Sequence, residues 1–385
     1  MAARLLAYQV ADLCLGKPPL RSLSSSATVA DALAAVKSSD ENFVAVWSCD
    51  HSAKRNLECV CVGKVCMVDV ICFLCRDENL SSPGLALRSP VSALLSNANG
   101  LVRHVAPSSS LIEAIDLLLE GAQNLVVPIK SSTTINSKRK HLQKSISPTI
   151  HNGQEFCWLT QEDVIRFLLS SIGLFSPIPA RSIDSLNIIS NEFLAVEYHC
   201  PAMSAIGAIS CSLADQTAVA VVDDEGTLIG EISPLTLACC DETVGAAILT
   251  LSAGDLMAYI DCGGPPEDIV GLVEARLKER NLEGMLREFM IVDSYGSNSS
   301  SSSDEEAAGG GAAVSRGQYR KFTSFSRRAE AIVCRRWSSL VAVMVQAIAH
   351  RVNYVWVVEE DGGVAGIVTF AGMLEVFREN LESLM

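Results

Sequence analysis

Ser110-Leu-Ile-Glu-Ala-Ile115 is followed, fifteen positions after its first residue, by the apolar run Leu125-Val-Val-Pro128. The same pair of segments, at the same spacing, starts at Thr28, at Met203 and at Ser339. Recurrence of a long pattern at fixed spacing is typical of a repeated supersecondary unit. The chain is therefore expected to contain four copies of one unit. The other three apolar runs are Phe43-Val-Ala-Val46, Ala218-Val-Ala-Val221 and Tyr354-Val-Trp-Val357.

Each copy is predicted to fold as β-α-β-β-α. In the second copy, Leu111, Ile115 and Leu118 are spaced to form one apolar face of a helix, with charged residues opposite. The strand after the helix is apolar throughout, which indicates burial on both faces. Aspartate and glycine follow at 223–226 and 359–363, where they favour a hairpin turn. A second strand then leads into the closing helix.

The copies differ mainly in what is inserted at the hairpin. The first copy has eight additional residues around 51–58, and the second has twenty within 131–154. Between the third and fourth copies, 268–287 is predicted to form an amphipathic helix. The serine-, acid- and glycine-rich tract after it is expected to be a disordered linker, in which Ser301–Ser303 fit acidophilic kinase sites. The predicted boundaries are 8–78, 79–175, 176–253 and 330–385 for the repeats, with the helical insertion and linker at 254–329.

Composition limits the class of function. The 385-residue chain is 49% hydrophobic, but no apolar run reaches the ~20 residues of a membrane helix, so no membrane partner is expected. A net charge of −14 disfavours nucleic acid as a partner. Fourteen cysteines without a signal peptide indicate reduced thiols and favour the cytoplasm. The residues leave open a plastid transit peptide at 1–26 and a nuclear signal at Lys138–His141.

The second strand of a copy closes on the pattern Gly-hydrophobic-hydrophobic-[Thr/Ser]-x-x-Asp. With the element order and the spacing, this resembles the CBS (cystathionine-β-synthase) domain, in four copies over about 8–250 and 330–380, as in the plant standalone CBS-domain proteins. The resemblance implies an α+β fold in which copies one and two pair sheet against sheet as one Bateman module, and copies three and four as another. It also implies a cleft for AMP, ATP or S-adenosylmethionine. The aspartate would accept hydrogen bonds from the ribose, and the hydroxyl would lie near a phosphate.

The closing motif is eroded differently in each copy. The second copy is complete, with Thr160 and Asp163, and the first keeps the acid, Asp69. The third and fourth keep the hydroxyl and lose the acid. Thr160, Asp163 and Asp69 are therefore the predicted ligand contacts, and a ligand is expected only in the first module. The remaining motif positions are degenerate: Cys66 in the first copy, Ser233 and Thr236 in the third, and Thr369 and Gly372 in the fourth.

The same motif has a purely structural interpretation. A hydroxyl three residues before an acid, at the start of an apolar run, is also a capping box, in which the two side chains satisfy unpaired N–H groups of the helix. Ser233 and Thr369, which lack the acid, fit capping alone. Thr160 and Asp163 are compatible with both interpretations.

No catalytic or metal-binding pattern is found. The sequence has no glycine-rich phosphate loop, nucleophile elbow or zinc-protease helix motif. Cys72 and Cys75 form an isolated CxxC and are interpreted as buried apolar residues. No enzyme activity, metal or required cofactor is therefore predicted. The histidines have no partner at metal or nucleophile spacing; they are His51, His104, His141, His151, His199 and His350.

The predicted function is that of a non-catalytic regulatory protein or sensor. Its first module would bind an adenosine-containing ligand, a partner protein, or both, and the angle between paired repeats would change with occupancy. One alternative is a kinase regulatory subunit similar to the gamma subunit of AMP-activated kinase. The other is a structural interaction protein whose clefts bind no ligand. An oligomer is compatible with all three.

Overall fold

The structure, a computed structural model, describes residues 7–39, 41–49, 59–95, 101–129, 150–151, 153–261, 266–287 and 330–383. The insertion around 51–58, most of the insertion at 131–154, the basic segment Lys138–His141 and the linker with Ser301–Ser303 lie outside these residues. His51 and His141 lie outside them as well. What the sequence predicts for these segments stays a prediction.

Four three-stranded sheets of identical topology confirm the fourfold repeat. In each sheet the first strand is parallel to the second, and the third is antiparallel to the second. The strands are β1 (Ser22–Ser24), β2 (Phe43–Ser48) and β3 (Val60–Cys66); β4 (Val102–His104), β5 (Asn124–Ile129) and β6 (Glu155–Thr160); β7 (Leu194–Glu197), β8 (Val219–Val222) and β9 (Leu228–Ile232); and β10 (Val333–Cys334), β11 (Tyr354–Val358) and β12 (Val364–Thr369).

The helix before the second strand of each copy starts close to its predicted position. Thr28 and Ser110 cap their helices by accepting hydrogen bonds from Asp31 N and Glu113 N, both at 3.1 Å. The Met203 copy differs, because a 3₁₀ turn, η5 (Ala202–Ala205), precedes the helix. These helices are α2 (Val29–Lys37), α6 (Leu111–Leu119), α8 (Ile206–Asp215) and α14 (Leu340–His350). The closing helices are α3 (Met67–Leu74), α7 (Gln161–Ser170), α9 (Pro234–Leu237) and α15 (Phe370–Glu382).

The repeats pair through their sheets within each half of the chain. Trp47 of β2 and Trp158 of β6 belong to one buried cluster between the first two sheets. In the second half, Glu231 of β9 contacts Tyr354 and Trp356 of β11. The α+β fold and its two Bateman modules are therefore as expected.

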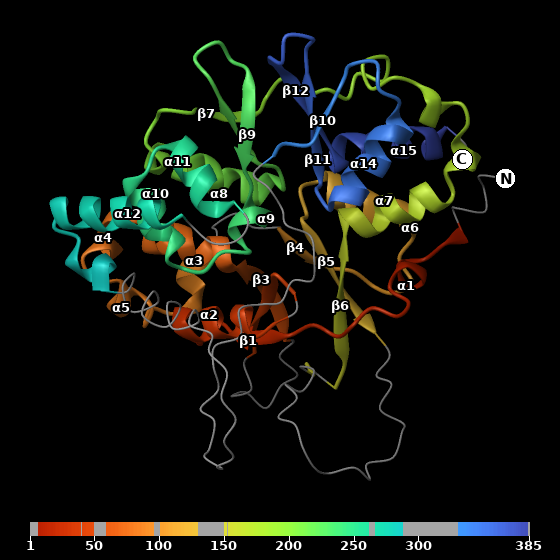
Figure 1. Ribbon diagram of the computed structural model, residues 1–385. Helices are drawn as coiled ribbons and strands as arrows, with labels where there is room; N and C mark the ends of the chain where they lie inside the picture. The colour runs from red at the N-terminus through yellow and green to blue at the C-terminus, as the bar shows by residue number, and fades with distance from the viewer. Residues whose placement is uncertain are drawn as a thin grey trace, which may run out of the picture.

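Helices join the two modules. The core that contains α2 and α3 continues into α8, α10 (Val244–Thr250) and α11 (Ala253–Ile260), whereas α6 and α7 share a core with α14 and α15. In Figure 1, the green helices of the third repeat lie above the orange helices of the first, and the blue helices of the fourth lie beside those of the second. Repeat one therefore packs on repeat three, and repeat two on repeat four.

Short segments cross between neighbouring repeats. Gln9, before α1 (Val10–Leu13), bridges to Ser110 of the second repeat, and Pro90 bridges back to Thr28 of the first. The second module repeats this exchange. The sequence boundaries of the repeats stay predictions, but in space the repeats of a module are interleaved. The connecting helices are α4 (Asp77–Leu80), α5 (Pro83–Ala86), η2 (Val91–Leu94), η3 (Ile172–Phe175) and η4 (Ile178–Ala180).

The helical insertion after the third repeat is partly as predicted. Helix α12 (Glu267–Glu279) buries Val273 and Leu277 completely, as its apolar spacing indicates, but it ends before the predicted limit at residue 287. Arg276 Nη1 donates to the carbonyl of Thr250, which anchors α12 to the end of α10. In the part of the chain that the structure describes, no helix combines the length and the apolar character needed to cross a membrane.

Candidate functional site

Thr160 and Asp163 lie together at the junction of β6 and α7. Thr160 N and Oγ1 both donate to Asp163 Oδ2, at 2.8 Å each, and Thr160 Oγ1 accepts from Asp163 N at 3.2 Å. The pair therefore forms the reciprocal capping box that the structural interpretation predicts. Capping and ligand contact are not exclusive, because all these bonds use a single carboxylate oxygen.

A lysine from the start of the chain lies against this carboxylate. Lys17 Nζ is 2.5 Å from Asp163 Oδ2, and the two side chains keep 22% and 24% of their surface exposed. Lys17 reaches Asp163 because the segment after α1 packs on the second repeat. The result is a partly exposed pair of opposite charges at the N-terminal end of a ten-residue helix. Such an end, with a nearby ammonium, favours bound phosphate.

The corresponding junction of the first repeat is more enclosed. Cys66 N donates to Asp69 Oδ2 at 2.7 Å, so the acid caps α3 although the hydroxyl is missing. Burial raises the pKa of Asp69, while Lys64 nearby partly offsets this shift. Lys64 Nζ donates to Asn124 Oδ1 of the second repeat at 2.6 Å. The polar contact between the paired sheets is therefore made by Lys64, and Asp69 lies near it as the cap of α3.

Lys64 should give the protein a measurable pH dependence. Burial lowers its pKa from 10.5 to about 8, so between these values the unfolded chain binds more protons than the folded chain. The free energy of unfolding should therefore rise through this window because of Lys64. Replacing Lys64 with methionine should remove this contribution. We expect the stability difference, wild type minus Lys64→Met, to increase from pH 8 to pH 10 in urea titrations. A constant difference would contradict the burial of the ammonium group.

In the second module the degenerate motifs act as helix caps. Ser233 Oγ accepts from Thr236 N at 3.1 Å and lies 2.8 Å from Thr236 Oγ1, and both residues are buried. Thr369 Oγ1 accepts from Gly372 N at 3.2 Å. No carboxylate occupies either motif. These residues therefore stabilise helix starts, as the sequence indicates for Ser233 and Thr369.

Two further sets of contacts lie within the second module. Glu231, which is buried, accepts from Tyr354 Oη and Trp356 Nε1, each at 2.7 Å, and so occupies the space between the paired sheets. Ser190 and Ile367 exchange backbone hydrogen bonds of 2.9 Å, which places residues 188–190 against β12 and the start of α15. The sequence pattern predicts neither feature, nor the contacts of Lys17 and Asn124.

A cavity of about 290 Å³ lies elsewhere, between η4 and the end of α15. None of the predicted ligand residues contributes to it. Its lining residues are Ile178, Arg181, Ser185, Leu186, Val376, Glu379 and Asn380.

Four β-α-β-β-α repeats that pair through their sheets, each closed by a capped strand-to-helix junction, define a four-repeat CBS protein. The chain belongs to the CBS domain-containing proteins: it is 52% identical, over 100% of both chains, to CBS domain-containing protein CBSX5 from Arabidopsis thaliana. It is 28% identical to CBSX6 from the same plant, over 97% of this chain and 94% of the relative. No family model matches the chain.

More distant comparisons agree with the fold. The chain is 23% identical to SNF1-related protein kinase regulatory subunit gamma-like PV42b from Arabidopsis thaliana, over 99% of this chain and 97% of the relative. Among solved structures, protein MJ1225 from Methanocaldococcus jannaschii, described as related to g-AMPK, superposes with a TM-score of 0.55. That match covers 96% of this chain and 100% of the other at 14% identity. This likeness shows a shared four-repeat architecture.

Proposed function

We propose that this CBS-domain regulatory protein binds an adenosine-containing ligand in its first module and transmits occupancy to a partner protein without catalysing a reaction. The observation that carries the proposal is the partly exposed Lys17–Asp163 pair at the start of α7. Only this copy of the closing motif has both the hydroxyl and the acid. AMP, ATP and S-adenosylmethionine are the candidate ligands.

The two charges suit the two ends of such a ligand. The contacts of Asp163 with Thr160 and Lys17 use Oδ2, so Oδ1 is the oxygen that a ribose hydroxyl would reach. A carboxylate accepts several hydrogen bonds, as two neighbouring hydroxyls require. Lys17 could exchange its ion pair with Asp163 for one with a ligand phosphate. Asp69, which is more enclosed, would be a secondary contact across the paired sheets.

The second module is proposed to have a structural role. Its motifs carry no acid, and Glu231 brings a negative charge between the sheets, where it is already bonded to Tyr354 and Trp356. A phosphate would be repelled by that charge. We therefore expect ligand to bind in only one of the two modules of each chain.

Replacing Asp163 with alanine should abolish or strongly weaken ligand binding. Loss of a hydrogen bond to a charged group costs about 1.5–3 kcal/mol, which corresponds to about 10- to 150-fold in affinity. The measurement is isothermal titration calorimetry of the full chain with ATP, ADP, AMP and S-adenosylmethionine.

Asp31→Ala is the matched control. Asp31 caps α2 through the same reciprocal bonds, with Thr28 N and Oγ1 donating to Oδ2 at 2.9 and 2.7 Å. Its loss should weaken a helix cap and leave binding unchanged. Equal affinities of wild type and Asp163→Ala, or absence of binding by all four compounds, would overturn the ligand proposal.

The resemblance to PV42b favours one second candidate, a kinase regulatory subunit. In that case affinity purification of the full chain from plant tissue should recover a kinase catalytic subunit in stoichiometric amount. A purification that recovers other partners would leave the first proposal standing. A protein that gains no thermal stability from any adenosine compound would instead act through surface contacts alone, since a ligand that binds the folded state raises stability by mass action.

A further inference from the structure

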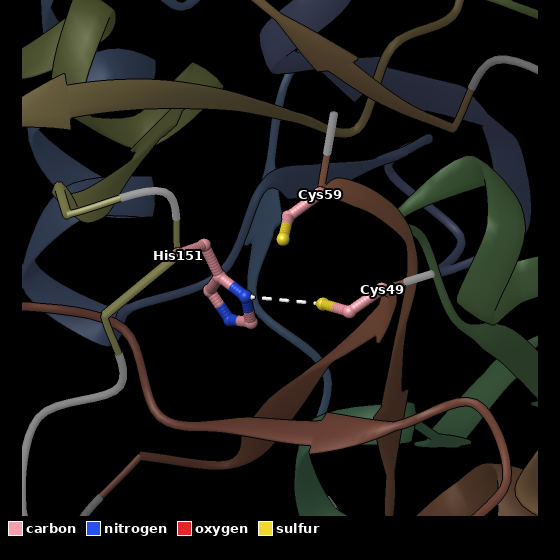
Figure 2. Close-up of side chains that lie close together, drawn as sticks. All are labelled: Cys49, Cys59 and His151. Atoms are coloured by element: carbon pink, nitrogen blue, oxygen red, sulfur yellow. Dashed lines mark hydrogen bonds between the residues drawn. The ribbon is translucent and has the colours of Figure 1, made fainter. Parts of the chain in front are cut away.

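Three side chains that commonly bind metals lie together beside the paired sheets of the first module. They are Cys49, directly after β2; Cys59, directly before β3; and His151, shortly before β6. One ligand atom from each lies within 4.8 Å of the others. Figure 2 shows both sulfur atoms on the same side of the imidazole ring. The three residues come from the ends of the two hairpins that carry the long insertions.

Backbone pairing explains why these residues meet. Ser48 pairs with Val60 in the β2–β3 ladder, so Cys49 and Cys59 stand at the next pair of positions. Neither cysteine forms a disulfide. His151 is held beside β6 by two backbone bonds with Gln154, of 3.0 and 2.9 Å. Cys49 and Cys59 are therefore positioned by the β2–β3 ladder, and His151 by the turn that leads into β6.

The imidazole ring of His151 is oriented by polar partners at both of its nitrogen atoms. Nδ1 lies 3.3 Å from Cys49 Sγ, and Nε2 lies 3.0 Å from Ser22 Oγ of β1. The ring stacks on the buried Trp47, with 3.8 Å between centroids and 8° between planes. Metal-binding histidines usually have their second nitrogen hydrogen-bonded in this way, which directs the other toward the metal.

We propose that Cys49, Cys59 and His151 form a binding site for a thiophilic divalent cation, with Zn²⁺ as the ion that fits best. Tetrahedral zinc, with Zn–S of about 2.3 Å and Zn–N of about 2.0 Å, requires ligand atoms about 3.5–3.8 Å apart. The observed separations are 3.3 Å between His151 Nδ1 and Cys49 Sγ and at most 4.8 Å for the other pairs, so small side-chain movements would bring the three atoms to this spacing. Water would supply the fourth ligand.

Charge balance also fits a divalent ion. On binding, both thiols would release their protons, and Nδ1 would donate its lone pair while Nε2–H donates to Ser22 Oγ. Two thiolates neutralise Zn²⁺, so the occupied site would carry no net charge at a place where two of its three ligands are buried. Because binding releases protons from the ligands, affinity should fall as the pH is lowered.

The isolated CxxC offers no comparable site. Cys72 and Cys75 lie in and directly after α3, and burial raises the pKa of both to about 12. Cys75 Sγ donates to the carbonyl of Gly245. Among the described residues, no histidine or acid completes a metal-binding group with them.

The test is titration of the reduced, chelator-treated full chain with Co²⁺, followed by displacement with Zn²⁺. We expect one equivalent of Co²⁺ with a thiolate-to-cobalt charge-transfer band that Zn²⁺ abolishes. Cys59→Ser and His151→Gln should lose this band. Ser22→Ala should weaken binding about tenfold, because it removes a hydrogen bond that orients the ring and leaves all three metal ligands in place. Cys211→Ser, at an exposed cysteine, should behave as wild type.

His151→Gln is the decisive variant because it removes no thiol. If it binds Co²⁺ with the band and stoichiometry of wild type, the metal binds adventitiously to other cysteines and the proposal is overturned. Absence of the band in reduced wild type would also overturn it. If the variants fail to fold, the wild type alone tests the proposal. Zn²⁺ should raise its melting temperature, and equimolar Mg²⁺ should not.

Discussion

Replacing Glu231 with leucine should destabilise the protein by about 2–6 kcal/mol, because two buried donors lose this acceptor and each unsatisfied group costs about 1–3 kcal/mol. Tyr354 Oη and Trp356 Nε1 both donate to this carboxylate across the paired sheets of the second module. Glutamate and leucine have similar volumes, so packing should change little. The measurement is the midpoint of urea-induced unfolding, converted to a free energy with the same m value for wild type and variant.

The companion variant Tyr354→Phe shows how much of the stability loss comes from the hydrogen bonds of Glu231 and how much from changed packing. It removes one donor and leaves the carboxylate bonded to Trp356, so a loss of about 1.5–3 kcal/mol, the value for one hydrogen bond to a charged group, is expected. In the double variant, Tyr354→Phe should recover part of the loss caused by Glu231→Leu, because one unpaired group is then absent. A Glu231→Leu protein within ~0.5 kcal/mol of wild type would contradict the buried network.

Replacing Gly366 with alanine should cost about 2–4 kcal/mol, the sum of a strained backbone and a steric clash. Gly366 has a φ of 155°, which is unfavourable for residues with a side chain. A Cβ there would lie 2.5 Å from Ser190 O and 2.8 Å from Ile189 Cγ2. The carbonyl cannot withdraw easily, because it accepts the hydrogen bond from Ile367 N.

Gly271→Ala is the matched control for this substitution. Gly271 lies in the interior of α12, and a Cβ there would contact nothing within 4 Å. Alanine in a helix interior should stabilise the protein by about 0.5–1 kcal/mol. Opposite signs for the two substitutions in thermal unfolding are therefore expected. A neutral or stabilising Gly366→Ala would show that residues 188–190 do not pack tightly on β12.

The fold could be predicted because its determinants are local. Thr28 and Ser110 cap their helices through backbone groups three residues away, and the apolar runs fifteen positions later form the central strands. The copy at Met203 starts its helix later, at Ile206, because residues 202–205 form a 3₁₀ turn. Local spacing thus predicts element types well and element starts less well.

The candidate site could be predicted only in part, because its decisive contacts are between distant residues. Thr160 and Asp163 are three positions apart and can be predicted from the sequence. Lys17 contacts Asp163 from a distant part of the chain, just after α1. Tyr354 meets Glu231 from 123 positions away. The available signal for Glu231 was its charge within a short apolar strand, Leu228–Ile232. A charged residue buried there requires partners that periodicity cannot identify.

The exchange of segments within a module affects the order of folding during synthesis. Residues around Gln9 find their partners only when the chain near Ser110 has emerged, about a hundred residues later. At about 5–20 residues per second, this delay is roughly 5–20 s. Until then Val10 and Cys14, both buried in the finished protein, remain exposed. This segment is therefore available to chaperones during synthesis, and the first unit expected to fold cooperatively is a pair of repeats.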